Sequence, residues 1–124
     1  MSGTLTLDTL SDKLNNSTSA TNVIRGSARA WVHFTGSSVP SIQSSFNVSS
    51  ITYNGTGDFT ATFTNAMPNA NLVVAGFGRI SGNGGFMQMA SNTPFTTTTC
   101  RFGTAVNGGG FSDPIITGIV IFGT

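Results

Sequence analysis

Short segments in which apolar and polar side chains alternate, separated by turn residues, set the strongest limit on how this chain can fold. In residues 28–34, Ala30, Val32 and Phe34 fall on one side of an extended chain, and Trp31 and His33 fall on the other. Comparable segments recur about every ten to fifteen residues, a pattern typical of antiparallel sheets. We predict strands within residues 28–34, 42–48, 51–53, 59–63, 71–80, 86–90, 96–102 and 115–122.

This pattern predicts an all-β fold: an antiparallel β-sandwich of about seven or eight strands, jelly-roll-like or a partly closed barrel. Ile42, Phe46 and Val48 share one face of the predicted second strand. Asn54–Gly55 predicts a hairpin, since both residues tolerate positive φ. Glycines predict a turn at residues 82–85 and a loop at residues 108–110.

Residues 1–26 differ from the rest and are interpreted as an extended N-terminal arm, with residues 27–124 as the β-sandwich domain. Leu5 and Leu7 alternate with polar residues, as in a short strand or an extended segment laid against another surface. A short helix over Thr9–Leu14 is the alternative. Leu5, Leu7 and Leu10 are the candidate docking residues of the arm.

Charge excludes several classes of protein. Charged residues are 7% of the chain and the net charge is +1, so a nucleic-acid partner is not expected.

Hydrophobic residues reach 38% with ten Phe, which favours folding over disorder. The longest apolar run, Ile119–Phe122, is too short for a membrane span, and no export signal is expected at the N-terminus. Because Cys100 is the single cysteine, a disulfide framework is excluded. We interpret Cys100 as a small residue on a strand.

The residues for catalysis are scarce. Two carboxylates in one cleft would have to come from four Asp, of which Asp58 and Asp113 suit turns better. His33 is the single histidine, and no G-x-S-x-G motif accompanies it. We therefore predict no enzymatic activity, no cofactor and no metal site within one chain, although copies of His33 around a threefold axis would offer a shared site.

So little charge predicts that part of the surface meets another subunit. Residues 115–122 have two apolar faces, which fits an oligomer interface or, equally, a central strand of a monomer. The candidate interface residues are Trp31, His33 and Phe122. Phe86 and Phe111 flank the glycine-rich stretches, so we list them as candidate ligand-loop residues, with plain connectors as the alternative.

Four blocks of this sequence resemble small modules of tailed-bacteriophage tail fibres and other virion proteins. The blocks are Arg29–Gly36, the stretch from Ile42 to Thr52, Asn54–Thr60 and Ala66–Pro68, and the closing Val120–Gly123 also matches. The opening residues 5–12 resemble the segment that precedes such modules. The resemblance covers most of the chain and is weakest over residues 82–110.

The resemblance implies a non-enzymatic virion protein on the tail or capsid surface, a homotrimer whose loops face the host. The leading hypothesis is a tail fibre, knob or receptor-binding adhesion module that contacts a host glycan or surface receptor. The alternative is a capsid decoration protein that docks on other virion proteins through its N-terminal arm. A glycan-active enzyme is a third class, which the shortage of carboxylates disfavours.

Overall fold

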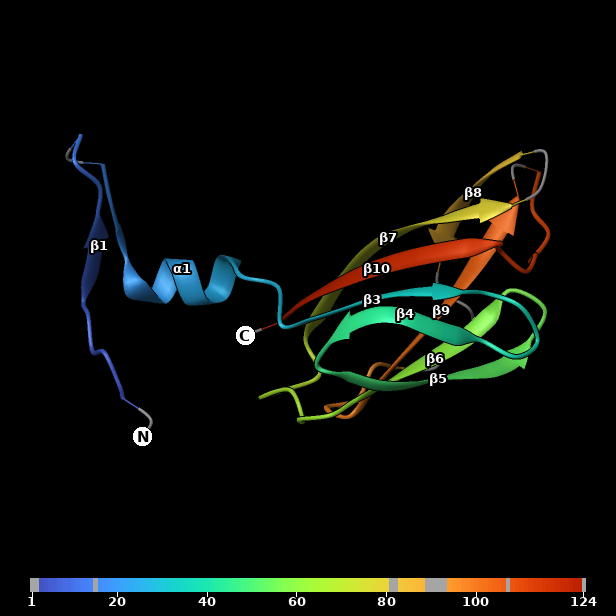
Figure 1. Ribbon diagram of the computed structural model, residues 1–124, viewed down its shortest axis with the longest axis horizontal. Coiled ribbons are helices and arrows are strands. Elements are labelled where there is room, and N and C mark those ends of the chain that lie inside the picture. Colours follow the sequence, from blue (N-terminus) through green and yellow to red (C-terminus); the bar gives the residue numbers. More distant parts are fainter. Residues whose placement is uncertain (1–2, 15, 81–82, 89–93, 107, 124) are drawn as a thin grey trace.

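The computed structural model describes residues 3–14, 16–80, 83–88, 94–106 and 108–123, and for residues 83–88 it describes the backbone only. An arm of two short strands and one helix leads into an eight-stranded β body. Figure 1 shows the arm beside one end of the body, the end where β3 begins and where the chain finishes. We call this end of the body its base.

The arm pairs β1 (Thr9–Ser11) with β2 (Ser17–Ser19) and continues into α1 (Ala20–Gly26). Asp12 forms the turn between the strands, because its Oδ1 accepts hydrogen bonds from the backbone N–H groups of Leu14 and Asn16. The side-chain amide of Asn16 also donates to Asp12 and, as the largest cause, lowers the pKa of that carboxyl. A side chain that bonds its own following turn disfavours helix, so the alternative helix over Thr9–Leu14 is wrong.

The body is one antiparallel sheet in the order β4-β3-β10-β7-β8-β9-β6-β5, bent so that its two halves face each other. Phe34 contacts Phe59 and Phe102 across the two halves, with ring centroids 5.3 and 6.1 Å apart. The predicted all-β, sandwich-like fold is thereby confirmed. The strands are β3 (Ala30–Thr35), β4 (Ser41–Phe46), β5 (Val48–Gly55), β6 (Asp58–Phe63), β7 (Leu72–Ile80), β8 (Asn83–Gln88), β9 (Thr99–Val106) and β10 (Ile116–Gly123).

Alternate residues of these strands form the core. Ala30, Val32 and Phe34 are buried on β3, as the alternation predicts, and Ile119 and Ile121 are buried on β10. The rest of the core includes Val48, Phe59, Ala61, Phe63, Met67, Cys100 and Phe102. Burial raises the pKa of the Cys100 thiol to about 12, so the thiol is protonated and unreactive at neutral pH. Cys100 is a strand residue of the core, as expected.

The single strand predicted over residues 42–48 is wrong, because the chain turns at Asn47 and divides it into β4 and β5. Asn47 has a φ of 55°, a conformation that Asn adopts more readily than most residues. Its side-chain amide donates to the carbonyls of Arg29 and Asn65, both at 3.2 Å, and its Oδ1 accepts from the Asn65 N–H at 2.8 Å. The corner also separates the faces: Val48 is buried, whereas Phe46 is 54% exposed.

The predicted hairpin is present between β5 and β6, but its turn lies two residues later than expected. Gly55 still pairs with Asp58, and Gly57 is the residue with positive φ, at 65°. Asp113 Oδ1 accepts from the Gly57 N–H at 2.6 Å, and Asp113 Oδ2 accepts from the Tyr53 hydroxyl at 3.2 Å. A carboxylate distant in sequence therefore holds this turn.

Two predicted boundaries differ from the structure in the second half of the chain. Gly84 and Gly85 belong to β8, opposite Arg79 and Gly78, so the predicted turn at residues 82–85 is wrong in extent. The predicted strand at 96–102 begins only at Thr99, because Thr96 Oγ1 accepts from the N–H groups of residues 98 and 99 and forms a tight turn. The strands predicted over residues 71–80 and 115–122 correspond closely to β7 and β10.

Candidate assembly surfaces

The outward side of strands β4, β3, β10 and β7 forms an apolar surface. Trp31 of β3 lies opposite Phe46 of β4 and Val120 of β10, and Val120 in turn lies opposite Ala75 of β7. Since alternate residues of β3 and β10 point into the core, these residues point away from it. We call this surface the outer apolar face and define it as Trp31, His33, Phe46, Val73, Ala75, Phe77, Gly118, Val120 and Phe122.

Large side chains of the outer apolar face are well exposed for their type. Trp31 is 39% exposed, Phe77 55% and Val73 66%. None of the nine residues is Asp, Glu, Lys or Arg; Arg29 immediately precedes β3 at the base, and Arg79 lies near the other end of the face, on β7. An apolar surface with charge only at its margins is typical of a protein–protein contact.

A shallow depression of about 270 Å³ lies near the centre of the outer apolar face. Trp31 and His33 of β3, Val120 of β10 and Phe77 of β7 are among the residues that line it. A Cβ on Gly118 would come within 2.7 Å of the Phe77 ring, so the ring lies directly on the glycine backbone. His33 supplies the polar side chain among the residues that line it, which suits an apolar protein surface better than a sugar.

The three predicted interface residues all lie on this one face. Trp31 and His33 are on β3, and Phe122 is on β10 opposite Val73. Whether the face meets another subunit stays a prediction. Sequence reasoning missed Phe77, whose spacing from Val73 could have indicated it, and it placed Phe46 on the core side because the corner at Asn47 was not recognised.

The predicted docking residues Leu5, Leu7 and Leu10 are brought together in the arm. With Ala20, Val23 and Ile24 of the following helix they line a groove of about 370 Å³. We call it the arm groove. Leu5 is 81% exposed, Leu14 is 81% exposed, and none of the described residues of α1 is buried. Leu5 and Leu7 precede β1 and lie outside any strand.

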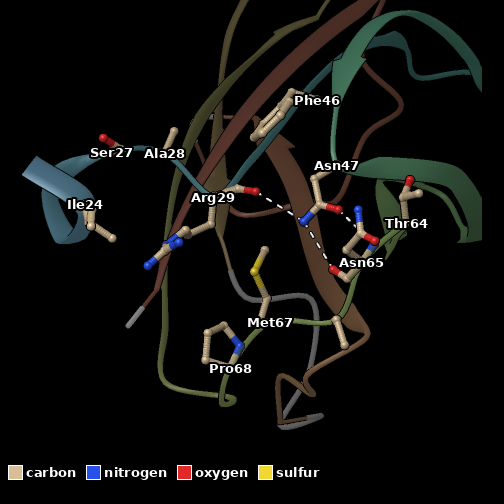
Figure 2. A pocket seen from close by; sticks show the side chains of 11 residues that line it. Ile24, Ser27, Ala28, Arg29, Phe46, Asn47, Thr64, Asn65, Met67 and Pro68 are labelled. Carbon is tan, nitrogen blue, oxygen red and sulfur yellow. Dashed lines mark hydrogen bonds between the residues drawn. The ribbon is translucent and has the colours of Figure 1, made fainter. Parts of the chain in front are cut away.

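A third hollow, of about 550 Å³, lies at the base of the body and is called the base pocket (Figure 2). Ile24, Phe46, Met67 and Pro68 provide its apolar lining, and Arg29 is the charged residue among those that line it. Asn47 lies between Arg29 and Asn65 and bonds both, which closes one wall (Figure 2). Arg29 Nε donates to the Gly123 carbonyl at 3.2 Å.

The structure describes the side chain of one candidate ligand-loop residue, Phe111, and only the backbone of the other, Phe86. Phe111 is 40% exposed, but its ring lies against Gly103, where a Cβ would come within 2.4 Å of it, so the residue also packs on the body. Gly108 and Gly109, both with φ of 108°, form the turn before it. The backbone of Phe86 pairs with Phe77 and Ala105 in β8, and its side chain lies outside what the structure describes.

Asp58 and Arg101 form an ion pair on the body. Arg101 Nε donates to Asp58 Oδ1 at 2.9 Å, and Nη2 donates to Oδ2. Hydrogen bonding from Arg101 is the largest cause that lowers the pKa of Asp58, and Asn54 adds a further bond to the same carboxylate. Asp58 thus begins β6 beside the hairpin turn and is fully engaged in holding structure.

Within the described part of the chain, no group of three His, Cys, Asp or Glu side chains is placed to hold a metal ion. The described residues likewise include no helix with the length and apolarity needed to cross a membrane. Comparison with known proteins finds no matching protein family, no matching curated protein and no matching solved structure.

Proposed function

We propose that this protein is a non-enzymatic structural component of a bacteriophage virion, a homotrimeric adhesion module of the tail. The observation that supports a homotrimer is the outer apolar face, which is wide, exposed and free of formal charge at its centre. The virion part depends on the resemblance of the sequence blocks, of which Arg29–Gly36 contains β3 and Asn54–Thr60 contains the β5–β6 turn.

A trimer formed through this face is a closed ring in which one part of the face on each copy meets a different part of the face on the next copy. Burial of Trp31, Phe46 and Phe77 removes from water the well-exposed aromatic side chains of the face, and aromatic residues dominate such contacts. The end of the body opposite the base, where Phe111 lies, then remains free to contact a host glycan or receptor.

Light scattering coupled to size exclusion tests the assembly. The wild-type protein should have a mass of three times 12.8 kDa, or about 38 kDa. Trp31→Ser should lower the mass toward that of one chain, because it removes an aromatic contact at the centre of the face. Val39→Ser is the matched control, since Val39 is 79% exposed in the β3–β4 loop and lies off the face. A monomeric wild-type protein would contradict the proposal.

The place on the particle is tested by antibody labelling of virions that carry this chain, viewed by electron microscopy. Label at the tail tip is the expected result. Label spread over the capsid would instead support the alternative, a decoration protein, which the exposed leucines of the arm favour as a docking device. Particles without label would contradict both functions.

A further inference from the structure

The arm groove, the base pocket and the outer apolar face join into one continuous surface. Ile24 lines both the arm groove and the base pocket. Phe46 lines the base pocket and, beside Trp31, also belongs to the outer apolar face. An apolar surface therefore runs from the leucines of the arm, past the base of the body, to the surface on which the proposed trimer depends.

The arm has too little packing of its own to hold its shape. Its two strands have three residues each and its helix has seven, lengths that are marginal in water without tertiary contacts. Leu5, Leu7 and Leu10 are at least 43% exposed, and Ile24 is 54% exposed. Another apolar surface must cover these side chains for the arm to be ordered.

We propose that the arm of one copy packs into the base pocket of a neighbouring copy of the same chain, an inference that rests on the proposed trimer. In a ring of identical copies, equivalent ends lie at the same end of the symmetry axis. Each arm then emerges beside the base of its neighbour, next to the pocket that it fills.

The chemistry of the base pocket suits the leucines of the arm. The Asn47 amide is already bonded to the Arg29 and Asn65 carbonyls, so the wall it forms needs no polar partner from a ligand. Phe46, Met67 and Pro68 offer apolar contacts. Asp8, exposed and adjacent to Leu7, carries the charge opposite to that of Arg29 at the pocket.

Cysteine cross-linking between two versions of the full chain tests this exchange. Leu7→Cys is placed in an untagged copy and Ala66→Cys, at the exposed margin of the base pocket, in a copy with a larger tag; the two are expressed together and mildly oxidised. A disulfide-linked species with the combined mass of both copies is the expected product. The buried Cys100 should not compete, and the wild-type pair serves as the control.

Ser37→Cys replaces Ala66→Cys in the matched control, because Ser37 follows β3 at the opposite end of the body, and it should give no mixed product. A chain that carries both Leu7→Cys and Ala66→Cys and links only within itself would overturn the inference, since the arm would then fill its own pocket. A trimeric mass without mixed cross-link would also overturn it and would leave the proposed trimer intact. A monomeric mass would defeat the trimer itself.

Discussion

Thr104 and Thr117 are both fully buried, but their hydroxyls have different surroundings. Thr104 Oγ1 donates to the Ser112 carbonyl at 2.7 Å, whereas Thr117 Oγ1 has no hydrogen-bond partner among the described residues. A buried hydroxyl without a partner costs about 1–3 kcal/mol. The two positions therefore offer a matched pair in which the same substitution has opposite effects.

Thr117→Val should raise the free energy of unfolding by about 1 kcal/mol, because it replaces an unpaired hydroxyl by a methyl group of similar size. Thr104→Val should lower it by about 1–3 kcal/mol, because the Ser112 carbonyl loses its donor. Urea denaturation of both variants measures the difference. Equal losses at the two sites would contradict the assignment of the Thr117 hydroxyl as unpaired.

The Asp58–Arg101 pair predicts a pH dependence of stability. The pKa of Asp58 is lowered in the folded protein, so folding favours its ionised form. The stabilisation is complete above the unfolded pKa, near 3.8, and is lost as the pH falls through the lower folded pKa. Asp58→Asn should be less stable than wild type at pH 7, and thermal unfolding should show this gap closing below about pH 3.8. A gap independent of pH would contradict the role of the ion pair.

At the scale of elements, the β5–β6 hairpin contains two glycines, Gly55 and Gly57, that look alike in the sequence but differ in their surroundings. A Cβ at Gly57 would come within 2.5 Å of the Thr104 carbonyl oxygen, in addition to the strain of a φ of 65°. A Cβ at Gly55 would meet nothing within 4 Å. The residue of this turn that requires a positive φ is therefore Gly57, and not a residue of the predicted Asn54–Gly55 pair.

Gly57→Ala should lower the free energy of unfolding by about 1–3 kcal/mol, through strain at positive φ and displacement of β9. Gly55→Ala should change it by less than about 1 kcal/mol and serves as the control. Thermal or urea unfolding of the two variants decides between the positions. A larger loss from Gly55→Ala would show that the turn lies where the sequence pattern placed it.

For the whole molecule, a contact made through the outer apolar face should respond weakly to salt. The face lacks formal charges at its centre, so screening has little to weaken. Raising sodium chloride from about 0.05 M to about 1 M should leave the mass seen by light scattering unchanged, and sodium sulfate should favour the larger species. Dissociation in sodium chloride would contradict an apolar contact and indicate ion pairs instead.

The sequence was most informative where neighbours along the chain decide the outcome. The alternation in β3 predicted its inward and outward residues, and the three interface candidates Trp31, His33 and Phe122 do lie on one face. It failed at Asn47, because the same residues can continue a strand or turn a corner. Contacts with Arg29 and Asn65, each eighteen residues away, select the corner.

The sequence by itself determined the all-β class, the core face of β3 and the leucines of the arm, because alternation with a period of two and shortage of charge are local properties. Tertiary structure alone decided that Phe46 points outward, that Asp113 holds the turn at Gly57, and that the arm groove, base pocket and outer apolar face form one surface. These outcomes depend on which distant segments pair in the bent sheet, and that pairing follows from the packing of the whole core.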